Sequence, residues 1–134
     1  MEILRCEGTD KKLYDLVAPL VMNPAVLRQN NNYPFKTSRK HVWFIAMEDE
    51  DVVGFMPVKT GEGRHCIDNY YIRGDRNDTL DYLLKSITSD RELGGSLVAV
   101  VHKRHVSAFQ RNGFASYIEY KNYEKMDYNA RKEI

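Results

Sequence analysis

The chain has 134 residues, which suits one domain that buries roughly two-thirds of its unfolded surface and excludes two independently folding catalytic domains. Its 20 lysines and arginines against 19 aspartates and glutamates leave a formal net charge of +1, so no overall field favours a polyanion such as nucleic acid. A hydrophobic fraction of 43% excludes a disordered chain.

Location and redox state are also predicted from composition. No run approaches the roughly 20 apolar residues of a membrane span, and the first residues lack the pattern of a secretory signal. We therefore expect a cytoplasmic protein with no membrane partner. Cys6 and Cys66 are too few for a disulfide framework and are expected to be reduced, and no CxxC or HxxxH spacing predicts a metal site.

The first elements are predicted from apolar spacing. Residues 2–6 form a short strand, and Thr9 then offers the N-cap of a helix. Apolar residues between Leu13 and Val21 recur at helical spacing, so this helix has one apolar stripe.

A second, shorter helix is predicted directly after the first. Asn23 is a good N-cap and Pro24 suits the first helical position, so the helix covers Ala25 to Gln29. The polar residues 29–34 end it and predict an exposed loop.

Three strands are predicted in the middle of the chain. Residues 42–47 and 52–58 are strand-like runs, and the acidic residues 48–51 between them suit a hairpin turn. Residues 65–72 follow a glycine-rich turn and predict one further strand.

A helical period begins at Thr79. Apolar residues from Leu80 to Ile87 form its stripe, and Asn77 or Asp78 is expected to cap it.

The last third of the chain is predicted to contain strand, helix and strand. Residues 96–101 are a nearly continuous apolar run, typical of a strand buried on both faces, as in a parallel pair. Residues 104–112 predict a short helix that Gly113 ends. Residues 114–126 alternate as a single last strand, and the polar residues 127–134 are expected to fray.

The predicted order is therefore strand, two helices, three strands, helix, strand, helix, strand. Hairpins come first and a strand–helix–strand–helix–strand section follows, so the fold class is mixed α/β, with one sheet covered by helices.

Three stretches in this order resemble the GNAT family of acyl-CoA N-acyltransferases. Residues 51–55 (DVVGF) resemble its acidic turn and third strand, 67–72 (IDNYYI) its fourth strand, and 107–114 (SAFQRNGF) its last helix with a terminal Gly-Phe. The resemblance spans residues 42–126. It implies a mostly antiparallel mixed sheet with a splayed parallel pair, flanked by helices, in a single domain over residues 1–126 with a C-terminal tail.

The resemblance also implies an activity. GNAT enzymes use acetyl-CoA as co-substrate and transfer the acetyl group to an amine by direct attack, and here the amine acceptor is unknown. A catalytically silent GNAT-like domain that binds CoA or regulates is the alternative. Nucleic acid is not an expected partner, and a homodimer stays open.

The family's phosphate-binding loop corresponds to residues 73–79. This stretch keeps Gly74 but lacks the second glycine of the pattern, and it places Asp78 where a phosphate would lie, with Arg73 and Arg76 to offset its charge. The residues that the resemblance assigns to cofactor binding are Tyr70, Tyr71, Ile72, Arg73, Gly74, Arg76, Asn77, Asp78, Thr79, His102, Arg104 and Phe109.

The general acid differs from the family pattern. Many members have a tyrosine four residues before the terminal glycine of the last helix, and Phe109 stands there in this chain. Phenylalanine cannot donate a proton, so the acid is another group such as Tyr117 or Tyr120, or water, or is absent. His102 stands where the family commonly has an asparagine.

The expected base is Asp68. A carboxylate in the middle of a strand is costly to bury unless it is hydrogen-bonded or placed at a cleft, and burial would raise its pKa to a useful value. His65 and Glu119 are the alternatives, and each could instead be a polar side chain that only contacts solvent. Backbone amides from Tyr70 to Arg73 are expected to polarise the carbonyl.

Two further groups of residues are candidates for binding. The aromatic ones either line an acceptor cleft or belong to the core: Tyr33, Trp43, Tyr70, Tyr71 and Tyr82. The cationic ones are the stretch 102–105, which could meet cofactor phosphates, and the segment Arg28, Lys36, Arg39 and Lys40, which alone would favour a nucleic-acid base or macromolecular lysine as substrate.

Overall fold

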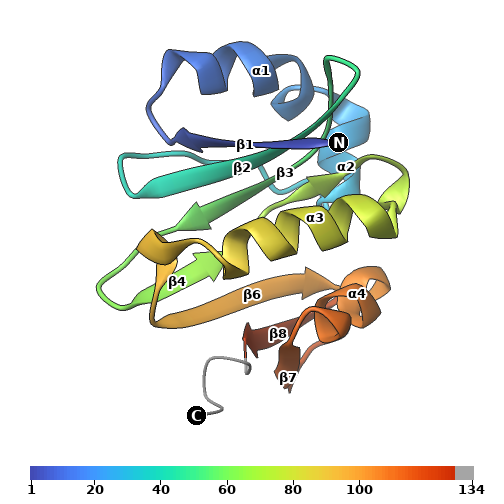
Figure 1. Ribbon diagram of the computed structural model, residues 1–134. Helices are drawn as coiled ribbons and strands as arrows, with labels where there is room; N and C mark the ends of the chain where they lie inside the picture. Colours follow the sequence, from blue (N-terminus) through green and yellow to red (C-terminus); the bar gives the residue numbers. More distant parts are fainter. Residues whose placement is uncertain (129–134) are drawn as a thin grey trace.

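A computed structural model describes residues 1–128 of the chain (Figure 1). Its elements, in chain order, are β1 (Glu2–Glu7), α1 (Lys11–Val21), α2 (Pro24–Gln29), β2 (His41–Glu48), β3 (Asp51–Lys59), β4 (Arg64–Ile67), β5 (Tyr71–Ile72), η1 (Arg73–Asp75), α3 (Asn77–Thr88), η2 (Arg91–Leu93), β6 (Ser96–His102), η3 (Lys103–His105), α4 (Val106–Arg111), β7 (Phe114–Glu119) and β8 (Tyr123–Tyr128). The predicted mixed α/β class is confirmed.

One sheet of eight strands organises the molecule. Its strand order is β1-β2-β3-β4-β6-β8-β7, and β5 pairs with β3 beside β4. The pair β4–β6 is parallel, as the apolar run at residues 96–101 predicted, and the other pairs are antiparallel.

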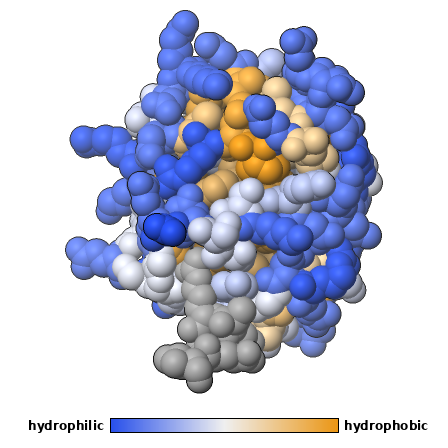
Figure 2. All heavy atoms as spheres, viewed as in Figure 1, coloured by the Kyte–Doolittle hydropathy of each residue, from blue (hydrophilic) through white to orange (hydrophobic). Residues whose placement is uncertain are grey.

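Helices cover both faces of the sheet, but not along its whole width. α3 and α4 lie on one face, in front of the sheet in Figure 1, where Leu80, Leu84 and Phe109 are fully buried. α1 and α2 lie on the other face, where Leu13 and Val26 are buried against the sheet. Each such buried side chain contributes about 1.5–3 kcal/mol by leaving water. Seen from the α3 side, charged side chains surround an apolar area (Figure 2).

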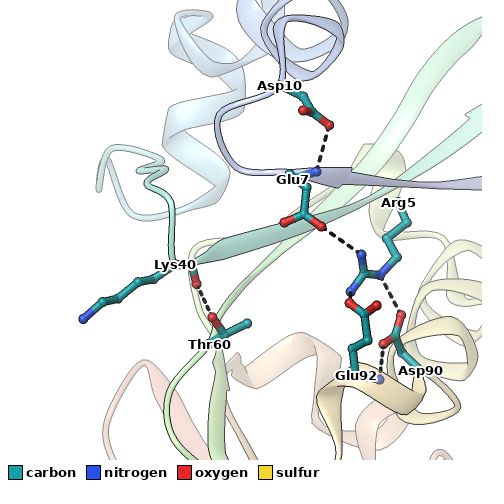
Figure 3. Close-up of polar contacts among 7 residues, drawn as sticks. All are labelled: Arg5, Glu7, Asp10, Lys40, Thr60, Asp90 and Glu92. Atoms are coloured by element: carbon teal, nitrogen blue, oxygen red, sulfur yellow. Dashed lines mark hydrogen bonds and ion pairs between the residues drawn. The ribbon is translucent and has the colours of Figure 1, made fainter.

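The helix starts agree with the sequence for α2 and differ for α1 and α3, since the cap of α3 is Arg76 and not Asn77 or Asp78. Asn23 caps α2 as predicted, because its Oδ1 accepts from the backbone N–H of Ala25 at 2.8 Å. The cap of α1 is Asp10 and not Thr9. The Asp10 carboxylate accepts from the backbone N–H of Glu7 at 3.1 Å, which ties the start of α1 to the end of β1 (Figure 3).

Two predicted strands were wrong in the same way. Residues 65–72 form two strands, since the backbone breaks at 68–70 with Asn69 at a positive φ of 53°. Residues 114–126 form the hairpin of β7 and β8, closed by a bond from the N–H of Tyr120 to the carbonyl of Tyr123 at 2.9 Å. β8 continues to Tyr128, so the first two residues of the predicted tail lie in the sheet, and residues 129–134 lie outside the described residues.

β6 is buried on one face rather than two. Leu97, Ala99 and Val101 are buried under α3 and α4, whereas Val98 and Val100 are only half-buried. Side chains alternate between the faces of a strand, so Val98 and Val100 point to the opposite face. That face is left open over β4, β6 and β8.

A cluster of charges joins the edge strand β1 to the connection between α3 and β6. Arg5 donates from Nε to Asp90 at 2.8 Å, and from its two Nη atoms to Glu7 at 3.2 Å and Glu92 at 2.7 Å (Figure 3). The hydroxyl of Thr60 donates to the carbonyl of Lys40 at 2.8 Å and so fixes the end of β3 against the start of β2.

Candidate active site

The break between β4 and β5 opens the parallel pair. β4 pairs with β6 only as far as Ile67, opposite Ala99, and β5 then pairs with β3 instead. β6 continues to His102 and keeps β8 as its partner on the other side. The last residues of β6 therefore have no strand on their β4 side, and the strands separate from residue 68 onward.

Tyr70 fills the inner end of this separation. It is 2% exposed, and its hydroxyl accepts from the backbone N–H of His102 at 3.2 Å, a donor that would otherwise lack a strand partner. Its ring packs against the rings of His102, His105 and Phe109, with centroids 5.2, 5.4 and 5.7 Å away. Phe109 thus contributes packing at the place where the family pattern has an acid.

The Tyr70 hydroxyl continues into a chain of buried hydrogen bonds. It lies 2.7 Å from Nδ1 of His105, whose Nε2 lies 2.7 Å from Oδ1 of Asp75. Burial lowers the pKa of His105, so the ring is neutral, donates from Nε2 to Asp75 and accepts at Nδ1 from Tyr70. Burial opposes the ionisation of Asp75, but hydrogen bonds from Arg104 and His105 hold its pKa below the ordinary value.

A cavity of about 350 Å³ lies beside the break. Its walls come from the loop after α2, from the break and from the ends of β6 and β8, and they include Tyr33, Asp68, Asn69, His102, Tyr123 and Lys125. Met126 belongs to the core under α3, so its neighbour Lys125 points to the open face of the sheet. The cavity is therefore on the face opposite α3.

Asp68 is at the junction of this cavity with a second one. The second cavity has a volume of about 270 Å³ and shares Asp68 and Asn69 with the first. The Asp68 residue is exposed, but desolvation by its surroundings raises the pKa of its carboxyl, an effect that Lys125 partly offsets. The structure thus places the predicted base on a cavity wall.

Asn30 holds the side chain of His102 in place, a role that the sequence did not predict. It was assigned to an exposed loop, but it is 3% exposed. Its Nδ2 donates to the carbonyl of Tyr33 at 3.1 Å and to Oδ1 of Asn69 at 3.0 Å, and its Oδ1 accepts from Nε2 of His102 at 3.2 Å. Burial lowers the pKa of His102 to about 4, so its ring is neutral. The run of asparagines carried no signal to separate Asn30 from its neighbours.

The predicted phosphate loop is occupied by the protein's own carboxylates. Arg76 donates to both carboxylate oxygens of Glu48, at 2.9 and 3.1 Å, and to both of Asp78, at 3.1 and 2.7 Å. Hydrogen bonds from Arg76 hold the pKa values of both carboxyls below their ordinary range. Asp78 also accepts from the N–H of Thr79 at 2.9 Å, at the start of α3. The predicted offset of Asp78 by Arg76 is confirmed, but Arg76 is fully engaged.

Some of the other residues assigned to this segment are exposed, and others belong to the hydrophobic core. Arg73 and Asn77 are exposed, and Gly74 has a φ of 63° that favours glycine. Thr79 is fully buried, and its hydroxyl lacks a hydrogen-bond partner among residues 1–128. Tyr71 and Ile72 are buried core residues.

The cationic side chains Lys103 and Arg104 of the stretch 102–105 are paired with carboxylates of the chain. Arg104 donates to Asp75 at 3.0 Å and to the carbonyl of Gln29 at 2.9 Å, and Lys103 binds Glu119 at 3.0 Å and Glu124 at 3.1 Å. The chain's own carboxylates therefore already engage these two side chains.

Several candidates lie outside the two cavities. Glu119 pairs with Lys103, and Tyr117 is 48% exposed; neither lines a cavity. His65 is buried with Nε2 3.0 Å from the carbonyl of Gly94, at the opposite end of β4. Trp43 is a core residue, and Tyr82 is exposed on α3.

Metal-binding side chains and cysteines were also considered as parts of a site. Within residues 1–128, no group of three or more histidine, cysteine, aspartate or glutamate side chains could hold a metal ion. Cys6 and Cys66 are both free thiols, and burial raises the pKa of Cys66 to about 11. In the same residues, no helix is both long enough and apolar enough to cross a membrane.

The mixed sheet, its separated parallel pair and its flanking helices define the GNAT acyl-CoA N-acyltransferase fold. An acyl-CoA N-acyltransferase from Pseudomonas aeruginosa matches with a TM-score of 0.71 and 15% identity over 95% of this chain and 99% of that one. The Campylobacter jejuni N-acetyltransferase PseH in complex with acetyl coenzyme A matches with a TM-score of 0.59 and 14% identity, over 94% and 97%. The PaiA N-acetyltransferase of Thermoplasma acidophilum in complex with coenzyme A matches with a TM-score of 0.57 and 13% identity, over 95% and 98%. By sequence, no protein-family model and no curated protein matches.

Proposed function

We propose that the chain is an acyl-CoA-dependent N-acyltransferase that transfers acetyl from acetyl-CoA, its co-substrate, to a primary amine. The GNAT fold supports acyl-CoA chemistry, and the complexes of PseH and PaiA support this donor. The observation that carries the proposal is the carboxylate of Asp68 on a cavity wall at the strand break. The catalytic unit is a single domain, which β8 extends beyond the predicted limit at residue 126.

In the proposed reaction, the amine binds in the larger cavity and gives a proton to Asp68. Its lone pair attacks the thioester carbonyl carbon, so a C–N bond forms, the C–S bond breaks and the electron pair leaves on sulfur. Backbone N–H groups of the Tyr70–Arg73 segment polarise the carbonyl oxygen. The raised pKa of Asp68 makes its carboxylate a better base than an ordinary aspartate.

A dedicated general acid is not required in this scheme. A thiol with a pKa near 8.5 leaves readily as thiolate, which then takes a proton from water, while the new amide nitrogen gives its excess proton to solvent and keeps one. Neither Tyr117 nor Tyr120 lines either of the two cavities that Asp68 borders, so neither is next to the proposed base. The Tyr70 hydroxyl is already used by His105 and His102, and burial raises its pKa.

The phosphates of acetyl-CoA would contact a loop whose side chains differ from the family pattern. At the start of α3 they would displace Glu48 and Asp78 from Arg76. Arg73 is the cation of this loop that has no ion pair within residues 1–128. We propose that Arg76 exchanges its carboxylate partners for phosphate when acetyl-CoA binds.

Calorimetric titration with acetyl-CoA, followed by assays of Asp68→Asn, tests the function. We expect a dissociation constant below about 1 mM and, in D68N, unchanged affinity with turnover lowered at least about 100-fold. Asp15→Asn on α1, an exposed carboxyl far from the break in sequence, is the matched control and should behave as wild type. Equal turnover in D68N and D15N would remove Asp68 from the mechanism.

The second candidate function is a silent GNAT-like domain that binds CoA or regulates. The Glu48–Arg76–Asp78 contact favours it, because that contact closes the phosphate site with two carboxylates against one guanidinium. No release of CoA in the presence of any amine would favour this candidate, and an acetyl-CoA dissociation constant above about 1 mM would then favour its regulatory form over its CoA-binding form.

A further inference from the structure

Two neighbouring cavities beside Asp68, which we together call the recess, lie on the open face of the sheet. They share Asp68 and Asn69 and have volumes of about 350 and 270 Å³. Ligand pockets for small molecules are commonly about 300–1,000 Å³, so the recess has the size for a small metabolite.

The charges on the walls of the recess are unequal. Lys125 lines the larger cavity, and Lys36 and Lys59 line the smaller one together with His41. Asp68 is the one carboxylate among the lining residues of either cavity. The walls therefore carry three lysines against a single carboxylate.

These three lysines are also unpaired. No carboxylate within residues 1–128 lies at ion-pair distance from any of them, although Lys125 lies over the ring of Tyr120 with Nζ 5.8 Å from its centroid. Elsewhere on the molecule, Arg5, Arg76 and Lys103 each bind two or more carboxylates. Unpaired cations gathered in a recess attract anions more strongly than scattered ones, because the walls focus their field.

We infer that the acceptor is a small primary amine that also carries a carboxylate or a phosphate group. The inference rests on the proposed function, since it takes Asp68 as the group that faces the amine. The ammonium approaches Asp68, and the anionic end approaches the lysines. A neutral amine as acceptor would leave the three lysines of the recess without an anionic partner. The side chain of a lysine in a protein acceptor carries an amine but no anionic group next to it.

Matched amines test this inference. Acetyl transfer is measured with ethanolamine, phosphoethanolamine and β-alanine, and we expect kcat/KM for the two anionic amines to exceed that for ethanolamine at least about tenfold. The advantage should shrink as sodium chloride is raised, because salt screens the lysines. Equal kcat/KM values for all three amines, with acetyl transfer intact, would overturn the inference and leave the proposed function standing.

Variants locate the anion site. Lys59→Gln and Lys125→Gln should each raise KM for phosphoethanolamine about fivefold or more, and Lys59→Gln should leave kcat and the KM for ethanolamine unchanged. Lys85→Gln, an exposed lysine on α3, is the matched control. Acetyl-CoA affinity should be the same in all three variants. A loss of acetyl-CoA affinity in K59Q and K125Q would assign these lysines to the donor and overturn the inference.

A binding measurement without turnover distinguishes a failure of the proposed function from a failure of the inferred acceptor class. Titration of the protein with phosphoethanolamine alone, followed by NMR, should show saturable binding that the K59Q/K125Q double variant weakens. If that binding is seen but no amine is acetylated, the proposed function fails and the ligand class is supported. If no binding is seen while ethanolamine is acetylated, the ligand class fails.

Discussion

The hydroxyl of Tyr70 lies 2.7 Å from Nδ1 of His105, inside the separation of the two parallel strands. The same hydroxyl accepts from the backbone N–H of His102 at 3.2 Å. One side chain thus satisfies two buried polar groups, this N–H and Nδ1 of His105. These two hydrogen bonds hold the end of β6 and the start of α4 against the break between β4 and β5.

Removing that hydroxyl should destabilise the fold. Tyr70→Phe leaves the His102 N–H and Nδ1 of His105 buried and unpaired, at a cost of about 2 kcal/mol in the free energy of unfolding. Urea denaturation measures this loss. Tyr82→Phe removes the hydroxyl of a tyrosine that is 51% exposed and should have almost no effect. Equal midpoints for the two variants would show that the Tyr70 contacts do not stabilise the fold.

His102 should make stability depend on pH. Its pKa is about 4 in the folded chain and about 6.5 when unfolded, so below pH 6.5 the unfolded state takes up a proton that the folded state excludes. Its stabilising contribution is therefore present above pH 6.5 and is lost as the pH falls toward 4, by an amount on the order of 2 kcal/mol. Thermal melts of His102→Gln between pH 4 and 7 should show a shallower loss than wild type. An unchanged slope would contradict the burial of a neutral His102.

Glu48 and Asp78 should weaken binding of acetyl-CoA. The variant Glu48→Gln/Asp78→Asn frees Arg76 and removes two negative charges at the start of α3, so acetyl-CoA affinity should rise about fivefold, and more at low salt. Calorimetric titration measures it. Glu92→Gln, which touches Arg5 instead, is the control. Weaker binding in the double variant would mean that the Arg76 contacts order the loop for the ligand.

Tyr117 should be dispensable for catalysis. Tyr117→Phe is expected to leave kcat and its pH profile unchanged, because the side chain is exposed and lines neither cavity. The same holds for Tyr120→Phe, apart from its stacking on Tyr123 at 4.7 Å. A drop of more than about tenfold in kcat for either variant would identify it as the acid.

Arg5 should stabilise the edge of the sheet. Arg5→Ala removes three ion pairs, two of which join β1 to the connection after α3, and a partly exposed network of this size is worth about 1 kcal/mol. The loss should appear as a lower melting temperature and should diminish in high salt. Lys11→Ala breaks a single exposed pair with Asp15 and should change the melting temperature less.

Local patterns predicted much of the fold. The apolar stripe of α3, the Asn23 cap of α2 and the apolar run of β6 all lie within a few neighbouring residues, so they were visible in the sequence. The hairpin of β7 and β8 was missed because its strands continue one alternating pattern through a short polar turn. The break at residues 68–70 was missed because Asn69 can adopt either sign of φ, and only packing selects the positive one.

The candidate site was predicted in part. Asp68 was predicted to be the base because a carboxylate in an apolar strand is unusual; the structure places the residue on a cavity wall, and its role as base stays a prediction. The cofactor loop was located by resemblance, but the pairing of Arg76 with Glu48, 28 residues away in sequence, was not foreseen. Nor was the burial of Asn30, whose partner Asn69 is 39 residues away.

The sequence by itself determined the mixed α/β class, the order of most elements and a carboxylate suited to base chemistry, since hydrophobic period and residue type act over short distances. Only the tertiary structure decided which charges are free. The near-neutral composition hid the fact that four arginines are paired with carboxylates, whereas within residues 1–128 three lysines remain unpaired beside Asp68. The physical reason is that ion pairs and open sheet faces depend on which distant segments pack together, and no local pattern encodes that.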